Sequence, residues 1–234
     1  MLLRNSLHEQ VLDRWGLAIV QGDYPVGARV ALGDAVTGVS ASRTVAREAT
    51  RVLEALGLVE VRRKLGAVVA PSEQWNAFDP LVIGWQLAST NVAAQIQWIA
   101  EVRSALEPAA AALAAQRSTP EHWAALTEAA IGLVKYSRAA DGPDYLAADV
   151  VFHRTLLTAS GNPMFAALGP SVEAVLRGRT AGGLMPQLAD ARAVRLHGDV
   201  AAAVSAGDAA GAAAAMREIV AEAAQAARAA LPPA

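Results

Sequence analysis

The stretch that decides the fold is residues 38–70, GVSASRTVAREATRVLEALGLVEVRRKLGAVVA. On a helix that begins near Ser42, a step of about 100° per residue places Arg43, Arg47 and Arg51 in one stripe. Apolar side chains lie roughly on the opposite side of this helix, at Val45, Ala49, Val52, Leu53 and Leu56. One face is therefore predicted to pack, and the other to present positive charge to a partner.

A β-hairpin with a basic tip is predicted directly after this helix. Gly57 stands where a glycine commonly ends a helix, and the apolar alternation over 58–61 and 67–69 is typical of two short strands. The turn between them ends at Gly66 and carries three consecutive basic residues, Arg62, Arg63 and Lys64. Residues 42–64 hold six basic and three acidic side chains, whereas the whole chain has a formal net charge of −2. This segregation of positive charge predicts binding to a polyanion.

Length and composition lead us to expect a two-domain protein of the cytoplasm. At 234 residues, the chain is long enough for one small and one larger domain. It has no cysteine, and therefore neither disulfides nor thiolate metal ligands, which suits a reducing cytoplasm. The first six residues are too short and too broken in hydrophobicity for a signal peptide. No stretch of about 18 large apolar residues is present, so we expect no membrane partner.

The pattern along the chain predicts a first domain over residues 1–72, a linker over 73–80 and an all-α domain over 81–234. The first domain opens with an amphipathic helix that ends at the turn 22–27, and a short helix over 34–39 precedes the helix that begins near Ser42. The alanine-rich remainder favours helices separated by short breaks, as in an antiparallel bundle. We expect these helices at 80–88, 92–116, 120–138, 142–160, 162–178, 186–206 and 208–230.

Five motifs in order carry a family resemblance: Ser42–Ala49, Arg51–Val59, Trp75–Pro80, Glu101–Arg103 with Leu106–Pro108, and Asp149–His153 running to Ser160–Pro163. Together they resemble GntR-family transcriptional regulators of the FadR-like subfamily. The resemblance implies an N-terminal winged helix-turn-helix followed by an all-α FCD domain that binds an effector. It also implies a dimeric repressor that a metabolite releases. The linker and the Glu-Val-Arg helix are similar to those of members that respond to galactonate and related sugar acids.

The resemblance assigns Ser42, Arg43 and Arg47 as DNA contacts, and Gly66 as the point of closest approach to the minor groove. An arginine guanidinium matches the O6 and N7 atoms of guanine in a bidentate way, and the Thr44 hydroxyl can bind phosphate. The three basic residues of the wing, Arg62, Arg63 and Lys64, complete the predicted DNA-binding set. The alternative to DNA binding is a basic helix face that is simply solvated, and three arginines by themselves would favour it.

One segment departs from the family pattern. Between Gly27 and Ser42 the chain is about two residues short, and the usual Pro-Ser-Glu-Arg-Glu stretch is replaced by Ala31–Asp34. One customary basic DNA contact is therefore absent, which predicts an altered operator affinity or sequence preference.

A carboxylate and two imidazoles are predicted to face the interior of the helical domain. Asp149 and His153 are separated by four residues and share an apolar helix face, and His197 shares another. The three could hold Zn²⁺ or a similar divalent ion, with water or effector completing the shell. They could equally bind each other and the effector in a metal-free pocket. The resemblance implies a fourth ligand, a histidine, at the position that Ile219 occupies here, so the metal site is incomplete.

Arginines are the candidates for binding an anionic effector. Arg103 lies on an apolar helix face, and a buried cation requires an anion. That anion could be Glu107, one turn further along the helix, in which case the pair is purely structural. It could instead be the carboxylate of a bound effector. The resemblance implies that the arginine at this position lines the effector cavity. Arg177 and Arg179 are further candidates for binding the carboxylate of an effector.

The chain is thus predicted to be a homodimeric DNA-binding repressor of a carbohydrate-acid or carboxylate catabolic operon. Its partners would be a palindromic double-stranded operator and a small carboxylate or sugar-acid effector. A metal-dependent enzyme or a metal sensor that uses the Asp/His/His cluster is the alternative. The sequence contains no glycine-rich phosphate loop, Gly-x-Ser-x-Gly elbow or His-Glu-x-x-His helix, so we expect no enzyme.

Overall fold

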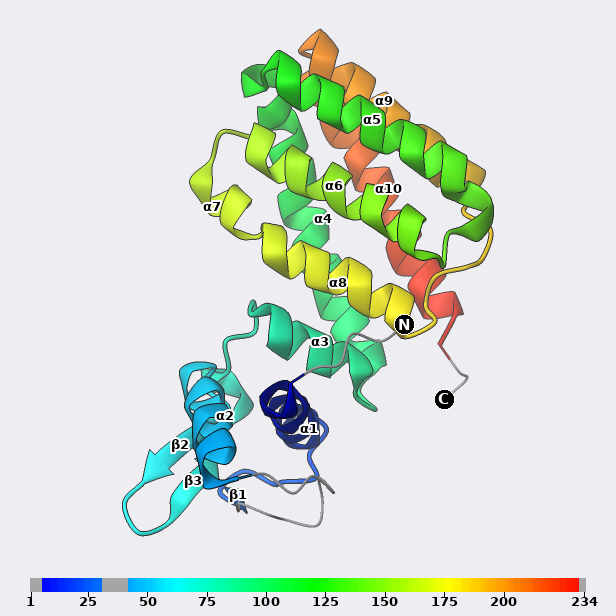
Figure 1. Ribbon diagram of the computed structural model, residues 1–234. Helices are drawn as coiled ribbons and strands as arrows, with labels where there is room; N and C mark the ends of the chain where they lie inside the picture. The colour runs from blue at the N-terminus through cyan, green and yellow to red at the C-terminus, as the bar shows by residue number, and fades with distance from the viewer. Residues whose placement is uncertain (1–5, 31–41, 232–234) are drawn as a thin grey trace. The chain divides into compact units, whose positions relative to one another are not determined.

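The computed structural model describes residues 6–30 and 42–231, and the chain divides into two compact units, Met1–Val92 and Ala93–Ala234 (Figure 1). The short helix predicted over 34–39 and the shortened segment Ala31–Asp34 lie outside the described residues.

The first unit combines helices with a small antiparallel sheet. Its elements are α1 (Leu7–Val20), β1 (Arg29–Val30), α2 (Arg43–Ala55), β2 (Val59–Arg62), β3 (Gly66–Val69), the 3-10 turn η1 (Ser72–Gln74) and α3 (Pro80–Ala88). The strand order is β1-β3-β2, and Ala67 of β3 pairs with Val61 on one side and Val30 on the other. The hairpin of β2 and β3 is the predicted wing. β1 was not predicted, because a strand of two residues has too little alternation to recognise.

Helix α1 forms because its start is capped and one face is apolar. The Ser6 hydroxyl accepts a hydrogen bond from the Glu9 amide at 3.2 Å, and the Glu9 carboxylate accepts one from the Ser6 amide at 2.7 Å. This reciprocal pair satisfies two amides that the helix start leaves without partners. The apolar face that the sequence predicted is buried, at Val11, Leu12, Trp15 and Ile19.

Helix α2 leads directly into the wing through Gly57. The Ser42 side chain caps the start of α2 by accepting from the Val45 amide at 3.3 Å. At the other end Gly57 has φ 77°, and the Leu58 amide returns to the Leu53 carbonyl at 2.9 Å. A Cβ at Gly57 would lie 2.2 Å from the Gln74 carbonyl oxygen. Both this clash and the positive φ therefore favour glycine at this turn.

The linker and α3 pack on the first unit. The Trp75 indole donates to the Ala70 carbonyl at 3.2 Å, and the Asn76 amide donates to the Leu56 carbonyl at 2.9 Å. Further on, the Trp85 ring lies directly against Gly16 of α1, and its indole donates to Asp13 at 3.1 Å. Helix α3 therefore lies within the first compact unit, whereas the sequence pattern placed residues 81–88 with the helical domain.

The second unit is all helical in its described residues. Its elements are α4 (Val92–Arg117), α5 (Pro120–Tyr136), the 3-10 turn η2 (Ser137–Ala139), α6 (Pro143–Ala159), α7 (Pro163–Ala167), α8 (Gly169–Ala181), α9 (Ala191–Ala206) and α10 (Ala209–Ala229). Two helix predictions need correction. The single helix expected over 162–178 is interrupted at Leu168, because Pro170 has no amide proton to continue it. The helix expected from 186 begins at Ala191, where Asp190 caps its first amides.

The helices of the second unit pack as neighbouring antiparallel pairs around an apolar core. Helix α5 packs against α6 and α9, α9 against α10, and α6 against α8 (Figure 1). The core between them includes Phe152, Leu156, Val200, Met216 and Ile219. The predicted class, a winged helix followed by a helical bundle, is confirmed. Among the described helices, none combines the length and the apolar character needed to cross a bilayer.

Candidate functional site

The basic stripe of α2 is exposed and its apolar face is buried. Ala46, Ala49 and Leu53 are at most 1% exposed, because they pack in the core of the first unit. On the outer face, the side chains of Arg47 and Arg51 are 68% and 62% exposed. Arg43, Ser42 and Thr44 are exposed at the beginning of the same helix. An exposed row of cations on a helix is the arrangement that binds nucleic-acid phosphates and reaches base edges.

The basic residues differ in their acidic neighbours. Arg51 pairs with Glu48 at 3.0 Å and Arg62 pairs with Glu60 at 2.8 Å, whereas Arg47 is 3.9 Å from Glu48. Exposed ion pairs of this kind are weak and exchange readily for phosphate.

The tip of the wing supplies further charge. Arg63, Lys64 and Gly66 are all exposed, and Lys64 and Gly66 have φ 68° and 81°. These left-handed conformations turn the chain tightly between β2 and β3. The tip of the hairpin therefore projects two cations beside a glycine that has no side chain to obstruct a close approach.

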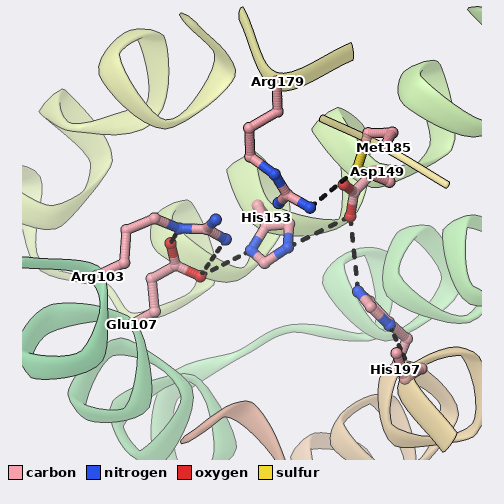
Figure 2. A network of polar contacts seen from close by, with 8 residues as sticks. Arg103, Glu107, Asp149, His153, Arg179, Met185 and His197 are labelled. Carbon is pink, nitrogen blue, oxygen red and sulfur yellow. Dashed lines mark hydrogen bonds and ion pairs between the residues drawn. The ribbon is translucent and has the colours of Figure 1, made fainter. Parts of the chain in front are cut away.

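A second site is buried in the helical unit, and Figure 2 shows its polar network. Its members are Arg103 and Glu107 from α4, Asp149 and His153 from α6, Arg179 from α8 and His197 from α9. Each is less than a tenth exposed. Buried charges are found where they pair with each other, a ligand or a metal ion, so this cluster is a candidate binding site.

Glu107 links Arg103 to His153. Arg103 donates to the two Glu107 oxygens at 2.5 and 3.3 Å, and His153 Nδ1 lies 2.8 Å from Glu107 Oε2. Burial by itself raises the pKa of the Glu107 carboxyl, but Arg103 and His153 outweigh it and hold that pKa at about 2. Of the two partners that the sequence offered Arg103, Glu107 is the one in contact.

The other side of His153 faces Asp149. His153 Nε2 is 3.3 Å from Asp149 Oδ1, and His197 Nε2 is 3.6 Å from the same oxygen. Burial lowers the pKa of the His153 imidazole, but the Glu107 and Asp149 carboxylates outweigh it and raise that pKa to about 9. Burial raises the pKa of the Asp149 carboxyl, but the interactions with the two neighbouring histidines outweigh it and hold that pKa well below its usual value.

The donor set of these three residues fits a divalent metal ion. The ligand atoms of Asp149, His153 and His197 lie within 4.8 Å of one another. Each ring also has an oxygen close to its Nδ1 atom: Glu107 Oε2 for His153, at ion-pair distance but outside hydrogen-bond geometry, and the Ala193 carbonyl, at 2.7 Å, for His197. A neutral histidine that donates a hydrogen bond from Nδ1–H to such an oxygen presents the Nε2 lone pair inward, as metal ligation requires. His197 Nε2 is buried without a hydrogen-bond partner and is therefore available to an ion.

Other candidate residues lie differently. Ile219, at the position of the fourth family ligand, is 3% exposed in the apolar core of the unit. Arg177 is 59% exposed and pairs with Glu173 at 2.8 Å, so the structure does not bring it to the cluster. Arg179, two residues further on, is 8% exposed and points into it. The contact of Glu107 with His153 joins α4 to α6, and no sequence spacing within one helix could have predicted it.

Fold and sites together define the class: a winged-helix DNA-binding unit with a helical ligand-binding unit. An FCD domain profile matches residues 98–222. The chain is 31% identical over 170 residues to the galactonate operon transcriptional repressor of Escherichia coli strain K12, covering 72% of this chain and 73% of that protein. The chain therefore belongs to the GntR family of transcriptional regulators, in the FadR-like group with an FCD domain.

Solved structures share the fold. Streptococcus agalactiae GntR aligns with a TM-score of 0.51 at 23% identity, over 93% of this chain and 99% of that one. Lar, which controls expression of the Listeria monocytogenes agr system, aligns with a TM-score of 0.56 at 17% identity, over 96% and 98%. The matched family and relatives are transcriptional regulators, and nothing in them supports the alternative of a metal-dependent enzyme or a metal sensor.

Proposed function

We propose that this regulator is a repressor of a carbohydrate-acid or carboxylate catabolic operon, released when a small carboxylate binds in the helical unit. It acts in the cytoplasm as a homodimer on a palindromic double-stranded operator. The relative named as a galactonate operon repressor supports a sugar acid as the effector class. The proposal rests on one observation: the same chain has an exposed arginine stripe on α2 and a buried cluster of arginines, histidines and carboxylates in the FCD domain.

In this proposal the DNA contacts are on α2 and the wing. Arg43 and Arg47 reach base edges or phosphates in the major groove, while Ser42 and Thr44 bind phosphate at the start of the helix. Ser42 already accepts the capping hydrogen bond of α2, so only its hydroxyl proton is available to a phosphate oxygen. The wing, with Arg62, Arg63, Lys64 and Gly66, lies along the adjacent DNA backbone.

The effector site is the buried cluster of Arg103, Asp149, His153 and His197. A divalent ion such as Zn²⁺ would be held by Asp149, His153 and His197, and would offer a Lewis-acid centre to a carboxylate oxygen. We assign Arg177 no contact with the effector, because its exposed guanidinium is bound to Glu173.

The experiment is a binding titration of the purified protein with its own upstream DNA, at two salt concentrations, with and without added acids. We expect affinity for the upstream fragment over a scrambled fragment, a steep loss with salt, and release by at least one sugar acid but not by its neutral alcohol. Equal affinity for both fragments would refute DNA-sequence recognition. Release by zinc alone, with no effect of any acid, would favour a metal sensor instead.

Metal content is measured separately on protein purified without a nickel column. We expect about one equivalent of zinc or a similar ion, lost on dialysis against a chelator together with a fall in melting temperature. Protein that is free of metal when purified, and takes up none on titration, would assign the cluster to a metal-free effector pocket.

A further inference from the structure

Arg179 is a buried cation that has no carboxylate within ion-pair distance in the described part of the chain. Its guanidinium Nη2 donates to the Met185 sulfur at 2.8 Å, and its Nε has no hydrogen-bond partner. Arg103 makes the contrast clear, since Glu107 holds its guanidinium with two hydrogen bonds. Arg179 is 8% exposed and Arg103 is 6% exposed, so folding removes both side chains from solvent to a similar degree.

Such an arrangement is costly for the ligand-free protein. A thioether is a weak acceptor, and it returns little of the hydration that a guanidinium loses on burial. Burial and the charge of Arg103 lower the pKa of Arg179 by more than the charges of Asp149 and Glu222 raise it, which is the sign of a cation whose surroundings compensate it poorly. A residue that lowers stability in this way is typically retained for binding.

Arg179 points toward the Asp149 and His153 side of the cluster, where Figure 2 shows it between α8 and Met185. Met185 belongs to residues 182–190, which connect α8 to α9 without regular secondary structure. The Leu184 amide donates to the Arg179 carbonyl at 2.9 Å, and two backbone hydrogen bonds anchor the second half of the connection, from the Ala140 amide to the Gln187 carbonyl and from the Ala189 amide to the Ser137 carbonyl, both at 2.8 Å. Met185 lies before these anchors, so its side chain can move without breaking them.

We propose that Arg179 is the residue that binds the carboxylate of the effector, and that the Met185 thioether occupies its guanidinium until the effector arrives. This inference rests on the proposed function, because it concerns the same effector site. Arg103 is then a positioning residue: its charge is already neutralised by Glu107, which in turn orients His153. The ligand class is a monoanionic carboxylate, since one negative charge is what Arg179 lacks.

The first test needs no ligand. Arg179→Met replaces the buried cation with an apolar side chain of similar length, and Arg177→Met is the matched control at the exposed position two residues away. We expect the melting temperature of ligand-free protein to rise in Arg179→Met and to stay near wild type in Arg177→Met. A clear fall in Arg179→Met alone would make Arg179 a structural residue and overturn the proposal.

The second test is calorimetric titration with galactonate, gluconate and xylonate, with the neutral alcohol galactitol as control. We expect the wild type to bind at least one acid and not galactitol. Arg179→Met should lower the affinity for that acid about tenfold or more, while the affinity of Arg177→Met should stay within about twofold of wild type. Met185→Leu should bind the acid as tightly as wild type or tighter, because no thioether competes for the guanidinium. Undiminished binding by Arg179→Met, or no acid bound by the wild type, overturns the proposal.

DNA binding separates this inference from the proposed function. Without acid, Arg179→Met should bind the upstream DNA as wild type does, and it should stay bound when the acid that releases wild type is added. Acid release in the variant at the wild-type concentration would overturn the inference alone. A wild type that never binds its upstream DNA would instead refute the proposed function.

Discussion

At the scale of single residues, Arg47 is the clearest test of DNA recognition. Its side chain is 68% exposed and is 3.9 Å from its nearest acid, so removing it should leave the fold unchanged. We expect Arg47→Ala to weaken operator binding by about 1–3 kcal/mol if it contacts a base. Fluorescence anisotropy with operator and scrambled DNA measures this, and Arg217→Ala, an exposed arginine of α10, is the control. Operator affinity equal to wild type would remove Arg47 from the interface.

Glu107 is the residue on which the buried charges depend. It is 1% exposed and contacts both Arg103 and His153. Glu107→Leu leaves the Arg103 cation without its partner, and should lower the free energy of unfolding by about 3–5 kcal/mol. The double variant Arg103→Met/Glu107→Leu should recover much of this loss, because it removes the Arg103 cation that the single variant leaves without a partner. Urea denaturation of the single and double variants measures both. A double variant no more stable than Glu107→Leu would contradict the pairing.

Glu222 should make the helical unit less stable at neutral pH than in mild acid. Burial, and then repulsion from Asp190, raise the pKa of the Glu222 carboxyl. Because the folded pKa lies above the unfolded one, ionisation as pH rises past about 4.5 costs stability. Glu222→Gln removes that ionisation, so its melting temperature should exceed wild type at pH 7 and equal it near pH 4. A difference that is the same at both pH values would exclude this origin.

At the scale of elements, the connection from α2 to the wing depends on Gly57. Gly57→Ala would place a Cβ against the Gln74 carbonyl and strain a left-handed residue. We expect a loss of at least about 1–2 kcal/mol and a wing displaced from α2. Gly84→Ala is the control: it lies within α3 with no atom near its Cβ, and alanine should stabilise the helix by about 0.5–1 kcal/mol. Chemical denaturation distinguishes them, and a neutral Gly57→Ala would show that the turn tolerates a side chain.

At the scale of the whole molecule, the proposed homodimer predicts an operator with two half-sites. Two identical recognition helices read the same sequence in opposite directions, with centres about one or a few turns of DNA apart. Light scattering should give about twice the chain mass, and removing one half-site should weaken binding far more than altering the spacer. A monomeric mass together with full affinity for a single half-site would exclude this assembly.

The elements that sequence alone determined are those whose signals are local. The amphipathic pattern of α1, the Ser42 cap, Gly57 after α2 and the proline and glycine breaks of the bundle each act within a few residues, and the structure confirmed the fold class that they predicted. The same local rules located the buried faces of Arg103, Asp149, His153 and His197. A residue's helix face follows from its own neighbours in sequence, which is why it could be predicted.

Only the tertiary structure decided which buried groups meet. Glu107 from α4 contacts His153 from α6, and Arg179 from α8 contacts Met185 of the following connection instead of an acid. Trp85 likewise attaches α3 to α1 through the space left by Gly16. These contacts depend on how helices distant in sequence are brought together, and the periodicity of one helix contains no information about the side chain that another will place opposite it.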